Sequence, residues 1–227
     1  MQAVYVDKCK QFKRTHKLLI IGAGGHGRVA ADIAIKMKRW KKITFLDDDQ
    51  NLLFSMGIKV IGITNDVFKY TRNHDIFVAI GNSKTREKIQ NSLEHKGANI
   101  PILIHPNAII GEKVEIGTGT VVMAGTVINC CSKIGKGCII NTGVTIDHDN
   151  IIENFVHLSP GVHTAGTVQI GKGSWIGIGA VISNNLNIIS ECVVGAGAVV
   201  VKNITETGFY VGVPAKKVNK PSESHIY

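Results

Sequence analysis

Aromatic side chains are scarce in this sequence, at 6% of its 227 residues. Proteins that bind single-stranded nucleic acid combine basic grooves with aromatic stacking side chains, and no stretch of this chain interleaves the two kinds of residue. The formal net charge of +9 therefore indicates a basic surface that is compatible with small anionic ligands. We expect no nucleic-acid partner.

Paired cysteines and long apolar runs are also missing. The five cysteines form no C-x-x-C pair and their number is odd, so we expect no bound metal and a reducing compartment. No apolar run reaches the length of a membrane span, and the segment from Met1 to Lys8 has no signal-peptide core. These absences predict a cytoplasmic protein without a membrane partner.

A strict period of six residues is present in the second half of the chain. From Ile104 to Val200, sixteen of the seventeen residues found at steps of six are aliphatic, and Thr164 is the exception. A helix gives apolar steps of three and four and an ordinary strand gives steps of two, so neither explains the pattern. A solenoid does, because each unit of six residues then forms one short strand and one corner.

A second position in each unit is mostly small or aliphatic, so each unit is expected to send two side chains inward. Three units would close one triangular coil of eighteen residues, and stacked coils would bury a continuous core. Cys138 and Cys192 fall on the small inward position, where free cysteine is a good core filler. The abundant glycines, 25 in all, suit the tight corners.

The units that begin at Ile116, Ile134 and Ile170 read I-G-x-G-[TCS]. They resemble the repeats of the hexapeptide-repeat acyltransferases, whose fold is a left-handed parallel β-helix. The resemblance implies such a β-helix over residues 103–218, as an acetyltransferase domain, with a short tail at 219–227.

The chain before the repeats has another pattern. Residues 1–16 form a basic lead-in to which we assign no function. Short apolar runs then alternate with helical segments, which predicts a small parallel α/β sheet of the Rossmann-like kind over residues 17–102. The expected strands are 17–22, 43–47, 58–63 and 75–81, and the expected helices are 28–39 and 84–96.

A glycine-rich loop follows the first expected strand. Gly22, Gly24 and Gly27 fit G-x-G-x-x-G, and Asp47 and Asp48 follow about twenty residues later. Glycines let a phosphate approach the backbone at a helix amino end, and an aspartate in this place meets a ribose or base. A full dinucleotide site needs a second half that the sequence does not contain, so the pattern favours a single nucleotide over NAD. A tight turn without a ligand is the alternative.

The motifs I-G-A-G-G-H-G, F-L-D-D and F-V-A-I-G-N precede the repeats, and together they sharpen the resemblance. From Lys17 to Val218 the chain is similar to the hexapeptide-repeat sugar acetyltransferases that include the bacillosamine-type UDP-amino-sugar N-acetyltransferases and the sialic acid O-acetyltransferases. The resemblance implies acetyl-CoA as co-substrate. It also implies that a UDP-amino sugar is bound by Gly24, Gly25, His26, Asp47, Asp48 and Gly81.

The repeat is irregular near Asn150, which occupies a small inward slot. Asp147, His148 and Asp149 lie beside it, and a local break of a regular rule is where function is expected. Histidine is the usual base for taking a proton from an attacking amine or hydroxyl. In the family, His148 matches the general base and Asp149 matches the acidic group that raises its basicity. The family pair is His–Glu, so Asp149 is one methylene shorter, and Asp147 is a rival partner.

The coil period predicts that Cys130, His148, Gly166 and Asn184 stack at one corner, with Gly166 leaving space for a ligand above His148. His157 lies half a coil further on and is expected to face another side. Both histidines then serve one site only if subunits pack together, which agrees with the family's homotrimer. The resemblance implies acetyl-CoA contacts from His157, Gly166, Ile178 and Ala196.

The sequence thus predicts direct, acetyl-CoA-dependent acetylation of the amine of a UDP-linked 4-amino-dideoxy sugar, in a polysaccharide pathway. O-acetylation of a sugar hydroxyl, as in a sialic acid, is the nearest alternative. A trimer that binds nucleotides without catalysis, and an NAD-dependent enzyme, are the alternatives from other classes.

Overall fold

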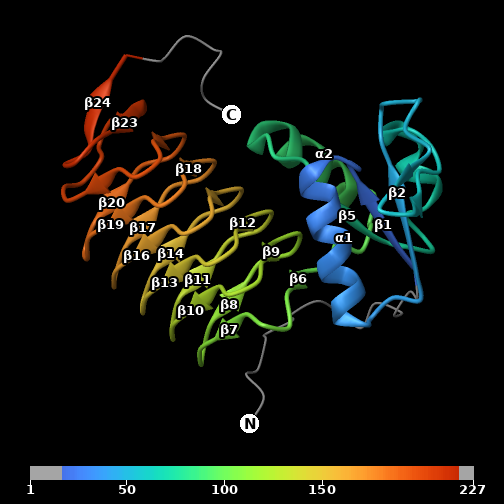
Figure 1. Ribbon diagram of the computed structural model, residues 1–227, viewed down its shortest axis with the longest axis horizontal. Helices are drawn as coiled ribbons and strands as arrows, with labels where there is room; N and C mark the ends of the chain where they lie inside the picture. Colours follow the sequence, from blue (N-terminus) through green and yellow to red (C-terminus); the bar gives the residue numbers. More distant parts are fainter. Residues whose placement is uncertain (1–16, 220–227) are drawn as a thin grey trace.

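The computed structural model describes residues 17–219. An α/β part lies beside a β-solenoid, and its contacts reach from the first coils to Glu191 in a late coil (Figure 1). The predicted lead-in 1–16, and the predicted tail apart from residue 219, lie outside the described residues.

The α/β part contains a parallel sheet in the order β2-β1-β5. Its strands are β1 (Lys17–Ile21), β2 (Lys42–Leu46) and β5 (Asp75–Val78). Residues 18–21 of the central strand are wholly buried, as the short apolar run predicted. All three strands are parallel, so their carboxyl ends meet at one edge, where open α/β sheets bind ligands.

Two helices follow the glycine loop and β5. Helix α1 (Gly25–Met37) begins three residues earlier than predicted, because Gly24 already has the N-cap position and its carbonyl oxygen accepts from Arg28 N–H at 2.9 Å. Helix α2 (Ser83–His95) is close to prediction, and the Asn82 side chain caps it by accepting from Thr85 N–H.

The strand predicted at 58–63 is wrong in most of its length. Only Ile58–Lys59 (β4) is strand, and it pairs antiparallel with Phe54–Ser55 (β3). Met56 and Gly57 have φ angles of 53° and 73°, which fits the two-residue turn that reverses a hairpin. Beyond this hairpin the chain touches β2 through one parallel bridge at Val60, and a 3₁₀ helix, η1 (Thr64–Lys69), follows.

The second part is the predicted left-handed parallel β-helix, and its period of six is confirmed strand by strand. Seventeen two-residue strands, β6 to β22, each end on one of the positions spaced six residues apart. Strands eighteen residues apart pair in parallel, as Ile128 does with Ile146. Three faces result, and we name them A, B and C in the order in which each coil visits them.

Face A contains β6 (Leu103–Ile104), β9 (Val121–Val122), β12 (Ile139–Ile140), β15 (His157–Leu158), β18 (Trp175–Ile176) and β21 (Val193–Val194), extended by β23 (Phe209–Val211) and β24 (Lys216–Val218). Face B contains β7 (Ile109–Ile110), β10 (Val127–Ile128), β13 (Thr145–Ile146), β16 (His163–Thr164), β19 (Val181–Ile182) and β22 (Val199–Val200). Face C contains β8 (Glu115–Ile116), β11 (Lys133–Ile134), β14 (Ile151–Ile152), β17 (Gln169–Ile170) and β20 (Asn187–Ile188).

The interior is filled as the two inward positions predicted. Ile146, Ile176 and Ile182 have no exposed surface, and Cys138 and Cys192 fill small slots with none. Full burial of an aliphatic side chain of this size contributes about 1.5–3 kcal/mol. The repeated column of aliphatic side chains is therefore the main source of the solenoid's stability.

The α/β part shares a core with face A. The outward side chains of Leu103, Val121 and Ile139 are buried in one cluster with residues of α1 and the sheet. Helix α2 lies along the corner between faces C and A, where Gln90 donates to Thr118 and Lys136 pairs with Glu94. The carboxyl edge of the sheet is thus held beside the solenoid.

Candidate functional site

The corner between faces B and C contains His148. Its Nδ1 lies 2.8 Å from Asp149 Oδ2, whereas Asp147 Oδ1 accepts from the His148 backbone N–H at 2.8 Å. The shorter side chain of Asp149 therefore reaches the ring, and of the two rival aspartates it is the one that contacts it. The hydrogen bond with Asp149 is the main reason that the pKa of His148 lies above its ordinary value.

Asn150 and Ser132 hold this corner from inside the solenoid. Asn150 is wholly buried, and its Nδ2 donates to the carbonyl oxygens of Asp147, His148 and Ala165 at 2.8, 3.2 and 2.9 Å. Ser132 Oγ donates to the Asp147 carbonyl oxygen at 2.8 Å. The irregular inward slot thus fixes the backbone on both sides of His148. Sequence reasoning missed Ser132, which occupies the same slot one coil earlier.

Replacing Asn150 with alanine is expected to destabilise the fold by about 1–3 kcal/mol, because carbonyl oxygens buried around the slot lose their donor. Chemical denaturation of the wild type and the variant measures this loss. Thr126→Val is the matched control, since Thr126 is equally buried but donates to only one carbonyl oxygen, that of Asn141. An Asn150→Ala loss no larger than that of the control contradicts the anchoring role.

Gly166 stacks on His148 as the coil period predicted, and Thr167 N–H donates to the His148 carbonyl oxygen at 3.0 Å. The expected open space is not present, however. A Cβ atom on Gly166 would lie 2.5 Å from His148 Nε2, so the imidazole itself covers the glycine. The lack of a side chain at Gly166 therefore provides room for the ring.

His157 lies on face A, away from the His148 corner, as its half-coil offset predicted. Its ring is stacked on Trp175 with centroids 5.9 Å apart and planes within 6°, and Asn141 Nδ2 lies 3.4 Å from its Nε2. Burial, with Arg86 and His26 nearby, lowers the pKa of His157 to about 3. The ring is therefore neutral near pH 7. Asn141 was missed by sequence reasoning, and Trp175 was identifiable only by its spacing of eighteen residues from His157.

A cavity of about 300 Å³ joins His157 to the α/β part. Gly81, Asn82 and Ser83 line one side, at the amino end of α2, and His157 and Trp175 line the other. The structure therefore brings the predicted sugar-site residue Gly81 together with the predicted acetyl-CoA residue His157 in one chain.

Ile178 and Ala196 stack at a different corner, between faces A and B, where Gly197 N–H donates to the Ile178 carbonyl oxygen. Ile178 is 56% exposed. Face B separates these residues from His148 and Gly166. Within one chain the structure does not bring the predicted acetyl-CoA residues together.

The predicted sugar-site glycines lie along the carboxyl edge of the sheet. A Cβ atom on Gly24, Gly25 or Gly81 would meet no other atom within 4 Å, so open space borders the backbone at all three. By contrast, a Cβ atom on Gly27 would lie 1.9 Å from the Gly22 carbonyl oxygen. The loop thus combines glycines that leave room for a ligand with one that the packing of α1 requires.

The two predicted sugar-site aspartates are engaged in structural hydrogen bonds, and within residues 17–219 the His26 ring is not. Asp47 accepts from the N–H groups of Ala23 and Asp49, at 2.7 and 3.0 Å, and Asp48 accepts from Thr64 N–H at 2.8 Å. His26 lies in the first turn of α1, and its Nε2 is buried without a hydrogen-bond partner in the described part of the chain. Burial, followed by the charge of Arg86, lowers the pKa of His26 to about 4. The ring is therefore neutral and partly buried, within the loop that the resemblance assigns to the sugar.

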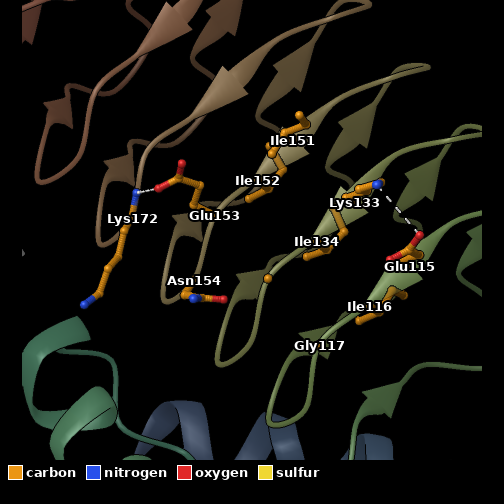
Figure 2. A pocket seen from close by; sticks show the side chains of 11 residues that line it. Glu115, Ile116, Gly117, Lys133, Ile134, Ile151, Ile152, Glu153, Asn154 and Lys172 are labelled. Atoms are coloured by element: carbon orange, nitrogen blue, oxygen red, sulfur yellow. Dashed lines mark hydrogen bonds and ion pairs between the residues drawn. The ribbon is translucent and has the colours of Figure 1, made fainter. Parts of the chain in front are cut away.

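A second cavity, of about 580 Å³, follows face C (Figure 2). Of its charged groups, Lys133 pairs with Glu115 at 3.9 Å and Lys172 pairs with Glu87 of α2 at 2.6 Å, and Glu153 accepts from the Lys172 backbone N–H at 2.8 Å. No predicted site residue lines it. Within residues 17–219, no cluster of three or more His, Cys, Asp or Glu side chains is placed to hold a metal ion. No helix in that range combines the length and apolarity needed to cross a membrane.

A β-helix of hexads with a histidine–aspartate pair at an open corner defines a class, the hexapeptide-repeat acyltransferases, and comparison with known proteins narrows it. Residues 17–93 match the family described as the PglD N-terminal domain. GDP-perosamine N-acetyltransferase of Escherichia coli O157:H7 is 28% identical over 184 residues, which cover 78% of this chain and 82% of that protein.

Two solved structures resemble the whole described fold. The acetyltransferase domain of PglB from Neisseria gonorrhoeae FA1090, also solved with acetyl coenzyme A, is 39% identical with a TM-score of 0.87, covering 90% of this chain and all of that one. PerB from Caulobacter crescentus, in complex with CoA and GDP-perosamine, is 33% identical with a TM-score of 0.85, covering 89% and 97%. The chain therefore belongs to the hexapeptide-repeat sugar N-acetyltransferase family, and it is an acyltransferase.

Proposed function

We propose that this protein transfers the acetyl group of acetyl-CoA directly to the amine of a nucleotide-linked amino-dideoxy sugar, with His148 as general base. The observation that carries the proposal is the hydrogen bond of 2.8 Å between His148 Nδ1 and Asp149. Both side chains are about half exposed, at 53% and 57%. The pair is therefore open to a substrate at a corner of the solenoid.

Asp149 holds the ring in the tautomer with the proton on Nδ1, which leaves Nε2 free to accept. The sugar amine attacks the thioester carbonyl carbon, so that an N–C bond forms. His148 Nε2 takes a proton from the attacking nitrogen. The C–S bond then breaks, and the imidazolium returns the proton to the leaving thiolate. No acyl-enzyme is formed.

The acceptor is held at the carboxyl edge of the sheet, where Gly24, Gly25 and Gly81 border open space. A UDP-linked 4-amino-dideoxy sugar is the first candidate for the acceptor. The glycine–histidine loop and the paired aspartates favour it. GDP-perosamine is the second, because two similar proteins carry that substrate in their names or complexes.

The working unit we propose is a homotrimer with sites between subunits. His148 and Ile178 lie on opposite sides of face B, so one chain does not offer both to the same acetyl-CoA. The outward column of face B reads Ile109, Val127, Thr145, His163, Val181 and Val199. Two apolar pairs thus flank a polar middle, and Ile109 and Val181 are 65% and 41% exposed. Packing of face B against neighbouring copies would cover it and bring the two corners together.

Free-thiol release from acetyl-CoA, measured with a UDP-4-amino-dideoxy sugar, GDP-perosamine and a sialic acid in separate reactions, tests the function. We expect rapid release with one nucleotide-linked amino sugar and an N-acetylated product by mass spectrometry. Saturating UDP or GDP, but not NAD, is expected to raise the melting temperature, since a ligand at 100 times its Kd stabilises by about 2.7 kcal/mol.

Three different results of these experiments would each contradict part of the proposal. Release with the sialic acid alone overturns N-acetylation in favour of O-acetylation. Binding of nucleotides without thiol release from any acceptor favours the non-catalytic trimer. Light scattering that gives the mass of one chain contradicts sites between subunits.

A further inference from the structure

Arg86 of α2 is a buried cation, and no acidic side chain among residues 17–219 pairs with it. Its side chain is 1% exposed, and within residues 17–219 its hydrogen bonds all go to backbone carbonyl oxygens. Removing a guanidinium from water is expensive, and a paired carboxylate usually compensates. The Arg86 charge lacks such a carboxylate, which favours a role of this side chain in function as well as in stability.

The four carbonyl oxygens belong to two parts of the molecule. In the α/β part, Nη1 donates to Ile80 and Gly81 at 2.8 and 2.7 Å. In the solenoid, Nε donates to Gly137 at 2.7 Å and Nη2 donates to Phe155 at 3.0 Å. One rigid, planar group therefore fixes the loop after β5 to two successive coils.

Both ends of this bridge border the candidate site. Gly81 lines the cavity from the α/β side. Phe155 is two residues before His157, which lines the cavity from the solenoid side. One side chain thus bonds both the loop of the proposed sugar site and the coil that leads to the proposed acetyl-CoA residue.

The ion pairs along α2 do not involve the loop. Glu94 pairs with Lys136 at 2.7 Å, Glu87 pairs with Lys172 at 2.6 Å, and Lys84 pairs with Glu191 at 3.4 Å; Figure 2 shows Lys172 extending from its coil toward the helix. A helical turn of about 5.4 Å nearly matches the strand spacing of about 4.8 Å, so each turn meets a new coil. These pairs align the helix, whereas the Arg86 side chain holds the carbonyl oxygens of Ile80 and Gly81 in the loop.

The charge of Arg86 also acts on two partly buried imidazoles, those of His26 and His157. After burial it is the next cause that lowers the pKa of His26, to about 4, and that of His157, to about 3. His157 also faces the His26 ring, the neutral Asn141 amide and Trp175, and Glu191 lines the same cavity. Both rings are therefore kept neutral in the working pH range.

We propose that Arg86 is a positioning residue for acetyl transfer, which holds the Gly81 loop in register with the His157 strand so that the two substrates meet. The proposal rests on the function proposed above. It predicts a loss of turnover that exceeds any loss of folding, because a misplacement of about 1 Å in bound reactants lowers rates by up to about 100-fold.

The test compares Arg86→Lys, Arg86→Gln and the wild type. Lysine keeps the charge but lacks the planar fork that reaches several carbonyl oxygens. We expect Arg86→Lys to lower kcat about tenfold or more and to raise the acceptor KM, with the acetyl-CoA KM within about threefold and the pH profile unchanged. In Arg86→Gln we expect losses at least as large, because glutamine has neither the charge nor the planar fork.

Lys136→Met is the matched control, because it removes a cation from the same interface without touching the loop. It is expected to keep the acceptor KM and kcat of the wild type. The proposal is overturned if both Arg86 variants keep wild-type kcat and KM per folded molecule, whether or not their melting temperatures fall, because Arg86 is then only structural.

Failure of the proposed function gives a different result. Wild-type protein that releases no thiol with any acceptor rejects the transferase proposal first. Arg86 is then tested by calorimetric titration with UDP and with CoA. At least tenfold weaker UDP binding in Arg86→Lys, with CoA binding unchanged, supports control of the Gly81 loop, and equal UDP binding in both proteins rejects it.

Discussion

Replacing His148 with alanine is expected to lower kcat by about 10²–10⁴-fold, the usual contribution of a general base. The acetyl-CoA KM is expected to change little, because the ring takes a proton in the transition state and is not needed to hold the cofactor. Thiol release at saturating substrates measures the effect. His95→Ala is the matched control, since His95 is an exposed histidine at the end of α2, far along the chain from the corner.

The pH profile of the wild type gives an independent test of the same residue. A general base acts when deprotonated, and the hydrogen bond with Asp149 raises the pKa of His148. The acid limb of kcat/KM is therefore expected above pH 6.5, with activity rising as the pH rises through it. In Asp149→Asn the limb is expected to move to lower pH, and the plateau rate is expected to fall because the ring is less basic.

Asp147→Asn is the control for this shift. Asp147 accepts from the His148 backbone N–H, and an asparagine side-chain oxygen can accept the same bond, so only a small movement of the limb is expected. Full activity in His148→Ala, or an acid limb that stays in place in Asp149→Asn, rules out the proposed base and its partner respectively.

Replacing Gly27 with alanine is expected to cause the largest loss of stability of any single change considered, about 3 kcal/mol or more. The new Cβ atom would lie 1.9 Å from the Gly22 carbonyl oxygen and 2.8 Å from its carbonyl carbon. Both are backbone atoms at the end of the central strand, so relief requires α1 to move away from the sheet. Urea denaturation and the yield of folded protein measure the loss.

Gly24→Ala is the matched control in the same loop. A Cβ atom there meets nothing within 4 Å, and the φ angle of Gly24 is −71°, so alanine fits without strain. We expect near wild-type stability with weaker binding of the nucleotide-linked acceptor. A Gly27→Ala protein as stable as Gly24→Ala would show that the helix can shift at little cost, contrary to this expectation.

The solenoid was predictable from the sequence because its rule is local and repeated. Each unit must send one aliphatic side chain inward. The period of six therefore predicts where each strand and each corner lies and which residues form the core. The parallel sheet followed from its short apolar runs. The strand predicted at 58–63 was mostly wrong, because an apolar run does not show that Met56 and Gly57 reverse the chain into a hairpin.

The candidate site was predictable only in part. The break in the repeat, with the family resemblance, identified His148, and the coil period correctly separated it from His157. The choice between Asp147 and Asp149 depends on backbone direction at a left-handed corner residue, where Asp149 has a φ angle of 57°. The period of six does not show which corner residue adopts this left-handed conformation.

By itself, the sequence determined the coil, the residues inside it and the corner where its regularity fails, because those depend on spacing along the chain. Only the tertiary structure decided that Asn150 holds that corner, that His26 is partly buried and neutral, and that Arg86 joins the Gly81 loop to the coil before His157. The Arg86 contacts link residues far apart in the chain, as Arg86 and Phe155 are, and they exist only because α2 lies along the corner of the stacked coils. Asn150 reaches Ala165 only because successive coils stack.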